Sequence, residues 1–290
     1  MKTSVSSYSY SNYMRQSGKN QLDLVALAKE MGFEAIEFTD LRAPEGVSQA
    51  DFARQIRAEA DRVGIDISSY TIGADFLNAE DLDKEVERLQ GQVDIAAILG
   101  VRVMRHDATG GYKGAERTYK TFEDALPILA EGCRRVTEYA AQKGIQTTVE
   151  NHGTFCQDSI RVEKLVHAVG HPNFGLLVDV GNFLCADDPS VTAVSRVASF
   201  ARHVHVKDFH IKPGNEPNPG KGFFTSRGGT YLRGAILGHG NVPVYQCLRI
   251  LKQSGYDGFV SIEFEGMEDN IPALEIGLAN LKTYISLKFY

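Results

Sequence analysis

Short apolar runs alternate with longer segments of helical periodicity along the whole chain. The short runs have the length and the β-branched and aromatic content that are typical of strands. They number eight, at residues 4–10, 33–39, 66–73, 101–107, 145–151, 174–180, 201–208 and 258–265. Several longer segments carry apolar residues on one face and end at a glycine, as in 20–32, 48–64 and 81–100, which is typical of amphipathic helices. The segment 117–144 is longer still, and Pro127 predicts a break or a kink in it.

Regular alternation of strands and helices predicts a parallel sheet. Eight such units in 290 residues predict an α/β fold of the closed (β/α)8 TIM-barrel type. A doubly wound open sheet is the alternative, but no GxGxxG motif follows the first strand, which removes the usual dinucleotide-binding interpretation. No shift in composition marks a linker, so we expect one domain over residues 1–290.

The segment 209–242, after the seventh predicted strand, is rich in Gly, Pro and Asn and has no helical period. Long connections of this kind in compact domains are often functional. In a barrel the segment would lie at the carboxyl-terminal face, where active sites form. We therefore expect a long active-site loop that serves as a lid.

The last four predicted strands carry polar side chains opposite their apolar ones. Because side chains alternate along a strand, the apolar set can pack against helices while the polar set points into the barrel. Near its carboxyl end, each strand offers one inward residue that could bind a metal. These are Glu150, Asp179, His205 and Glu263. Three buried carboxylates would repel one another without a cation, so the pattern predicts one divalent metal ion, Mn²⁺, Co²⁺, Mg²⁺ or Zn²⁺.

Four motifs in the second half of the chain carry a family resemblance. They are TVENHG (148–153), LLVDVGN (176–182), HVHVKD (203–208) and VSIEFEG (260–266). They resemble the xylose isomerase-like barrel superfamily, and within it the sugar isomerase and epimerase group of ketose 3-epimerases, hydroxypyruvate isomerases and inosose dehydratases. The strand order extends the resemblance over nearly the whole chain. It implies that Glu150, Asp179, His205 and Glu263 are the metal ligands, and that Glu150 and Glu263 are the acid/base pair.

The expected activity is that of a metal-dependent isomerase or epimerase acting on a sugar or a sugar derivative. A carbonyl and a neighbouring hydroxyl held by the metal would be polarised, which acidifies the adjacent C–H bond. Glu150 and Glu263 could then remove and return a proton on opposite faces of a metal-bound enediolate.

Three other functions compete with this one. The same site could expel a β-hydroxyl group, as in a dehydratase that acts on a keto-polyol like the inosose dehydratases. A non-catalytic sugar-binding barrel is a second alternative. A DNA repair enzyme of the AP endonuclease type is a third, but the histidines of its multi-zinc cluster would be needed where Tyr70 and Asn182 stand.

The chain departs from the ketose epimerase pattern at two positions. Many of those enzymes have a histidine three residues after the strand-six aspartate, where Asn182 stands here. Their arginine shortly after the strand-seven histidine is replaced by Ile211. Arg227 or Arg233, both in the long loop, could take the place of that arginine.

Six residues are candidate substrate contacts because they end a predicted strand or lie in the adjoining loops. They are His106, His152, Asn182, Lys207, Arg233 and His239. In the seventh strand, alternation places His203 one residue pair deeper than His205 and predicts a buried packing group. Lys207 is expected one pair further out, at the rim, where it could bind substrate or pair with a ligand carboxylate. Glu37, at the end of the second strand, could support the ligands.

Composition and charge narrow the class of partner. The net charge is −6 and the pI about 5.8, which argues against a nucleic-acid partner. No apolar run is long enough to span a membrane, and the amino-terminal segment does not look like a signal peptide. The four cysteines are scattered, with no CxxC pair. We expect a cytoplasmic protein with free thiols, a small sugar or polyol substrate and no membrane partner; the resemblance implies a homodimer or homotetramer.

Overall fold

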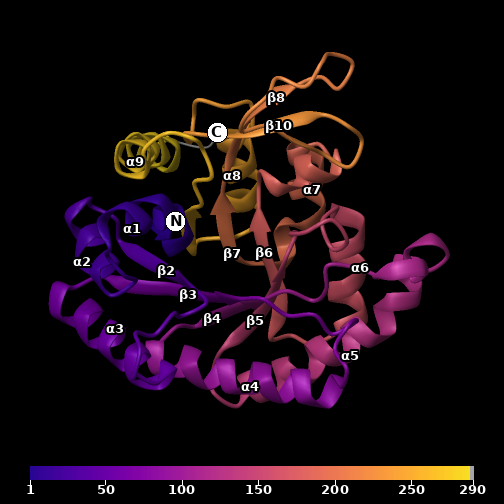
Figure 1. Cartoon of the computed structure of the whole chain (residues 1–290), viewed down its shortest axis with the longest axis horizontal. Coiled ribbons are helices and arrows are strands. Elements are labelled where there is room, and N and C mark those ends of the chain that lie inside the picture. Colours follow the sequence, from indigo (N-terminus) through magenta and orange to yellow (C-terminus); the bar gives the residue numbers. More distant parts are fainter. Residues whose placement is uncertain (288–290) are drawn as a thin grey trace.

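The computed structural model describes residues 1–287, and its main feature is a closed barrel of parallel strands (Figure 1). The strands pair in the order β1-β11-β7-β6-β5-β4-β3-β2. Their bounds are β1 Lys2–Ser6, β2 Ala35–Thr39, β3 Asp66–Ile72, β4 Val103–His106, β5 Gln146–Glu150, β6 Phe174–Asp179, β7 Ala201–Val206 and β11 Phe259–Ile262. The predicted (β/α)8 TIM barrel is confirmed.

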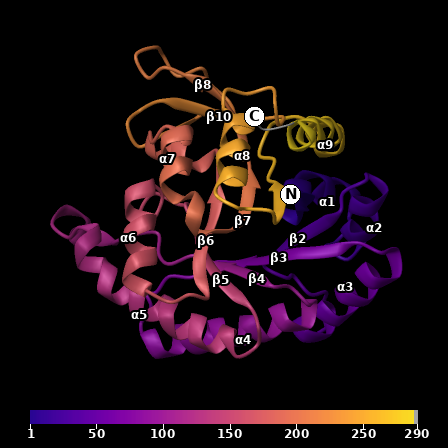
Figure 2. The ribbon, with the colours of Figure 1, turned by 180° about the vertical axis from the view of Figure 1, so that it is seen from behind.

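Helices surround this barrel on the outside, as Figures 1 and 2 show from opposite sides. In chain order they are α1 Ser11–Ser17, α2 Asp23–Glu30, α3 Gln49–Val63, α4 Leu82–Leu99, α5 Phe122–Ala141, α6 Ser159–Val169, α7 Ser190–Val197, α8 Val244–Gln253 and α9 Asn270–Ser286. Within residues 1–287, none of these helices is long and apolar enough to cross a membrane.

Helix boundaries follow local signals in the sequence. The Ser48 side chain accepts a hydrogen bond of 3.1 Å from the Asp51 amide at the start of α3, and Gly64 ends that helix with φ of 70°. The break predicted at Pro127 is wrong, because α5 runs through it without interruption. Proline in the second turn removes one main-chain hydrogen bond, and the fully buried Leu129 and Cys133 keep the helix packed on the barrel.

The first strand is shorter than its alternating pattern predicts. It ends at Ser6, and Ser7–Tyr10 form a 3-10 turn instead of continuing to residue 10. The Ser6 hydroxyl accepts from the Tyr8 amide at 3.4 Å. A serine therefore caps a turn in a segment whose alternating pattern predicted a strand. Tyr10 is fully buried after the turn.

The barrel sheet separates apolar from polar side chains as alternation requires. Val204 lies opposite Val178 on one neighbouring strand and Val260 on the other, and all three are fully buried in the layer under the helices. His205, one residue on, points the other way and lies opposite Asp179 of β6. The carboxyl ends of these strands therefore carry the polar groups inside the barrel.

Part of the segment 209–242 forms a small antiparallel sheet, a structure that the sequence pattern did not predict. Its strands are β8 Asp208–Lys212, β9 Phe224–Thr225 and β10 Tyr231–Ala235, in the order β8-β10-β9. The sheet projects from the carboxyl end of the barrel strands, at the top of Figure 1. The Asp208 carboxylate holds its base by accepting from the amides of Gly238 and Gly240 at 2.9 Å and of Val242 at 3.0 Å.

Candidate active site

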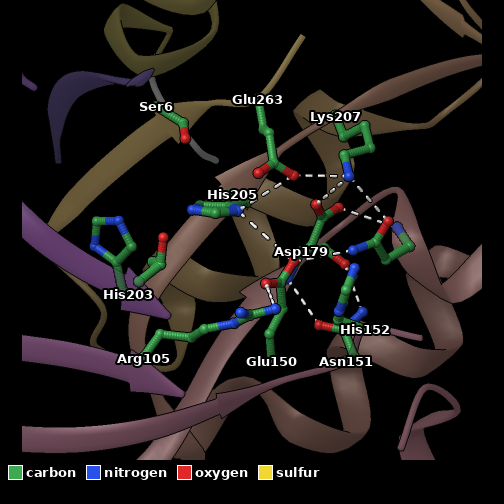
Figure 3. Close-up of polar contacts among 12 residues, drawn as sticks. Ser6, Arg105, Glu150, Asn151, His152, Asp179, His203, His205, Lys207 and Glu263 are labelled. Atoms are coloured by element: carbon green, nitrogen blue, oxygen red, sulfur yellow. Dashed lines mark hydrogen bonds and ion pairs between the residues drawn. The ribbon is translucent and has the colours of Figure 1, made fainter. Parts of the chain in front are cut away.

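The four predicted metal ligands converge at the carboxyl ends of β5, β6, β7 and β11, which are neighbours in the barrel. One ligand atom from each of Glu150, Asp179, His205 and Glu263 lies within 4.8 Å of every other (Figure 3). The first three side chains are buried, and Glu263 is slightly open to solvent. Residues distant in sequence thus form one compact acidic cluster.

Two buried atoms of this cluster have no hydrogen-bond partner among the described residues. They are Asp179 Oδ2 and His205 Nδ1. The other oxygen of Asp179 is satisfied, because it accepts from the amides of Gly181 at 2.8 Å and Asn182 at 3.0 Å. Leaving a buried polar atom unpaired is costly, and three carboxylates with one imidazole suit a divalent cation. The residues present therefore fit one divalent metal ion.

Glu37 lies beneath the cluster and binds both histidines of β7. His205 Nε2 lies 2.9 and 3.0 Å from the two Glu37 oxygens, and His203 Nε2 lies 2.6 Å from Oε2. Burial alone would raise the pKa of Glu37, but the two histidines outweigh burial and hold it below its usual range. Because Nε2 of His205 is occupied, Nδ1 faces the cluster, 3.7 Å from both Glu150 and Glu263. His203 is buried and hydrogen-bonded, as expected.

Lys207 lies inside the cluster and not at the rim, where the sequence placed it. Its side chain is 3% exposed, and Nζ lies 2.7 Å from Glu263, 3.1 Å from Glu265 and 3.6 Å from Asp179. The rim position was wrong because the long side chain folds back onto these carboxylates. Burial lowers the pKa of Lys207, but the same carboxylates raise it further, so the ammonium group stays charged.

Arg105 of β4 was missed by the sequence analysis. Its Nη2 lies 2.8 Å from Glu150 and 2.8 Å from Asp107, and the side chain is almost fully buried. The available signal was an arginine near the end of a predicted strand, which has to find an acidic partner if it is buried. Burial lowers the pKa of Arg105, but Asp107 and Glu150 together raise it above its ordinary value.

His106, the predicted contact on β4, is not brought to the site. Alternation gives the inward position to Arg105, so His106 points to the outside of the barrel and packs edge-on against Phe76, with ring centroids 5.7 Å apart. The imidazole is fully buried, and burial lowers its pKa to about 4. It is therefore a neutral packing group.

Asn182 and His152 lie beside the ligands. Asn182 Nδ2 donates to Glu150 at 2.9 Å, and its Oδ1 accepts from Lys207 at 3.2 Å. Asn182 thus connects Glu150 to Lys207 through its side-chain amide. His152 is half exposed, with Nδ1 3.2 Å from Asp107, and this hydrogen bond raises its pKa.

Arg233 and His239 lie outside the residues that line the cavity. Arg233 is 3.5 Å from Glu268 and covers the ring of Phe223, 5.8 Å from its centroid. His239 is exposed in the turn after β10. Arg227 is the arginine of this segment that does line the cavity.

The cavity above the cluster has two lobes. The inner lobe, about 240 Å³, has Glu150, His205 and Glu263 in its lining, together with Arg105. The outer lobe, about 380 Å³, is lined by residues of the β5–α6 connection, of the segment after β6 and of the small sheet, together with Lys207 and Glu265. His152 and Glu265 line both lobes, so the two hollows meet between these side chains.

Comparison with known proteins identifies the family. The chain matches the xylose isomerase-like TIM barrel model over residues 25–284. An inosose dehydratase of Geobacillus thermodenitrificans (strain NG80-2) is 23% identical, over 70% of this chain and 70% of its own length. The L-ribulose-5-phosphate 3-epimerase UlaE of Salmonella heidelberg (strain SL476) is 24% identical, over 90% of this chain and 88% of its own.

A solved structure gives the same result for the fold. The xylose isomerase-like TIM barrel protein from Mycobacterium smegmatis, in complex with magnesium, superposes with a TM-score of 0.74 at 17% identity, over 98% of this chain and 97% of that chain. Both the family model and this superposition span most of the barrel described above. The chain belongs to the xylose isomerase-like TIM barrel family.

Proposed function

We propose that this protein is a divalent-metal-dependent isomerase or epimerase of a sugar or sugar derivative, with Glu150 and Glu263 as its acid/base pair. The observation that carries the proposal is the placement of the two carboxylates, each 3.7 Å from His205 Nδ1. Each also has its own cation, Arg105 at 2.8 Å from Glu150 and Lys207 at 2.7 Å from Glu263. Two separately held carboxylates are what proton removal and return require.

The charges around the pair lower the pKa of both carboxylates. Burial would raise the pKa of Glu263, but Lys207 and His205 lower it to about 2, and Arg105 lowers that of Glu150 in the same sense. Both carboxylates are therefore ionised at neutral pH and can accept a proton. A divalent ion held by Glu150, Asp179, His205 and Glu263 would supply Lewis-acid polarisation of a substrate carbonyl.

A dehydratase acting on a keto-polyol is the second candidate. The match to an inosose dehydratase favours it. The buried Lys207 ammonium, 2.7 Å from Glu263, is also placed where it could donate a proton to a departing hydroxyl group. Both reactions begin with removal of a proton next to a carbonyl, so they share the same first step at Glu150 or Glu263.

Exchange of substrate hydrogen with solvent deuterium tests the shared step. The metal-loaded protein, incubated in deuterium oxide with a panel of ketoses and keto-polyols, should exchange the hydrogen next to the carbonyl, as seen by proton NMR. Glu263→Gln should reduce exchange by at least about 100-fold, because the amide cannot accept the proton. Mass spectrometry of the product then separates the candidates, since an epimer keeps the substrate mass and a dehydrated product loses one water.

Two results would contradict the proposal. One is full activity after a chelator has removed divalent metal from the protein, checked by elemental analysis. The other is unchanged exchange in Glu263→Gln. Glu116→Gln is a suitable control, because that glutamate lies on the exposed 3-10 turn after β4 and pairs with Lys120.

A further inference from the structure

The small sheet covers the outer lobe of the cavity, and hydrogen bonds hold it in place on both sides. Arg227 ties the small sheet to the β5–α6 connection, since its guanidinium donates to Asp158 Oδ2 and to the Thr154 carbonyl at 2.9 Å each. On the other side, the Ser226 hydroxyl donates to Asp187 Oδ1 at 2.7 Å. A ligand in the outer lobe would meet a surface that is already held in place, which lowers the entropic cost of binding.

One wall of the outer lobe is aromatic. The Phe224 ring is 40% exposed and packs edge-to-face on the buried Phe209, with ring centroids 5.7 Å apart. An exposed ring held in this way offers a flat apolar face to the outer lobe. Such a face suits the C–H side of a sugar ring.

Gln157 adds an unused hydrogen-bonding group to the same lobe. It is 5% exposed, it lines the lobe, and its side-chain amide has no partner within the described part of the chain. The amide lines the lobe, so it can both donate to and accept from a ligand hydroxyl there. An aromatic face beside a free amide is the combination that recognises a neutral polyhydroxylated group.

The charges of the outer lobe disfavour an anionic ligand. Arg227 is paired with Asp158 at 2.9 Å, and Lys207 with Glu263 at 2.7 Å. Glu265 places a further carboxylate where the two lobes meet. The His152 ring, which also lines the lobe, is hydrogen-bonded to Asp107. A phosphate would therefore find each cation of the lobe already paired and would lie near Glu265.

We infer that the outer lobe binds an uncharged second sugar ring, so that the substrate is a glycosylated keto-sugar instead of a free or phosphorylated monosaccharide. This inference rests on the proposed function, which places the reacting carbons over Glu150 and Glu263 in the inner lobe. The glycosyl group extends past His152 and Glu265, stacks on Phe224 and hydrogen-bonds to the Gln157 amide.

Three probes that differ only at the terminal carbon test the inference. They are fructose, fructose with a phosphate on its terminal carbon and fructose with a glucosyl group on the same carbon. Binding to the metal-loaded full chain is measured by calorimetry. The glucosyl probe should bind at least about tenfold more tightly than either of the others, which is the size expected for one stacking contact and one hydrogen bond.

Variants connect the preference to the lobe. Gln157→Ala and Phe224→Ala should each weaken binding of the glucosyl probe by about fivefold to tenfold and leave fructose binding unchanged. Phe223→Ala is the matched control, because the adjacent Phe223 packs under Arg233 and does not line the lobe. Thermal melting of each variant confirms that the chain is folded.

The outcomes separate this inference from the proposed function. Equal binding of fructose and the glucosyl probe, tightest binding of the phosphorylated probe, or no effect of Gln157→Ala and Phe224→Ala would each overturn the inference. Glu263→Gln should abolish deuterium exchange while it keeps the preference for the glucosyl probe. A preference without exchange in the wild-type protein would contradict the proposed function alone, and exchange without preference would contradict the outer-lobe inference alone.

Discussion

Side-chain alternation along β5, β6, β7 and β11 is sufficient to predict which four side chains converge at the carboxyl ends of these strands. Glu150, Asp179 and His205 could be chosen because each is a potential ligand that interrupts an apolar strand near its end. The partners that orient them could not be found in this way. Arg105 reaches Glu150 from the adjacent strand β4 through its long side chain, and Glu37 reaches His205 across the barrel, so these contacts depend on side-chain length and strand order.

Glu37→Gln is predicted to weaken metal binding without removing a ligand. The carboxylate accepts from Nε2 of both His203 and His205, at 2.6 Å and 2.9 Å, which fixes the imidazole of His205 with Nδ1 toward the cluster. The amide of a glutamine would present a donor to one of these nitrogens. Loss of such an orienting partner typically costs about 10-fold to 100-fold in metal affinity. Competition with a fluorescent chelator measures the change.

His203→Asn is the control for this variant. It removes one donor to Glu37 but keeps the bond between Glu37 and His205, so its effect on metal affinity should be smaller than that of Glu37→Gln. Equal metal affinity in Glu37→Gln and wild type would show that Glu37 does not position His205.

At the level of elements, periodicity predicted the barrel strands and most outer helices but not the small sheet. Its β9 strand has two residues, Phe224–Thr225, which is too short for any alternation to be visible. The pairing of Leu232 with Ile211 joins residues on either side of a Gly- and Pro-rich stretch. The register of such a pair is set by packing over the barrel, and local sequence patterns do not contain that information.

Asp208→Asn is predicted to loosen the small sheet while the barrel stays folded. The carboxylate accepts from four backbone amides, those of Phe209, Gly238, Gly240 and Val242. An asparagine would turn a donor toward at least one of them and leave it unpaired, at a cost of about 1–3 kcal/mol. Hydrogen–deuterium exchange should increase in residues 209–242.

The control is Asp61→Asn, on the exposed face of α3, where an ion pair with Arg57 contributes little. An increase spread evenly over the barrel strands would contradict this role for Asp208.

On the scale of the whole molecule, the acidic cluster makes stability depend on pH and metal together. Burial raises the pKa of Asp179 to about 6 despite the nearby Lys207, because Glu150 and Glu263 also raise it. For His205, burial lowers the pKa, but Glu37 and Glu263 raise it further, to well above 6.5. Both groups therefore bind protons more tightly in the folded metal-free protein than in the unfolded chain.

The sign of the pH effect follows from these two shifts. A raised pKa stabilises the folded state fully below the pKa of the unfolded chain, and this stabilisation is lost as pH rises through the folded value. The metal-free protein should therefore lose stability as pH rises from about 4, the ordinary pKa of an aspartate, to about 6, where Asp179 gives up its proton. It should lose more above about pH 6.5, where the unfolded chain releases the proton that His205 keeps in the folded state.

A divalent ion should reverse this trend, because it replaces the protons on Asp179 and His205 and binds more tightly as they leave. We predict that the rise in melting temperature on adding Mn²⁺ is small near pH 5 and largest near pH 8, by the linkage of binding to stability. Calorimetric scans with and without the ion measure this difference. In Asp179→Asn the lower part of the pH dependence should disappear, because the amide has no proton to lose. A melting-temperature rise that is independent of pH would mean that the ion binds somewhere other than this cluster.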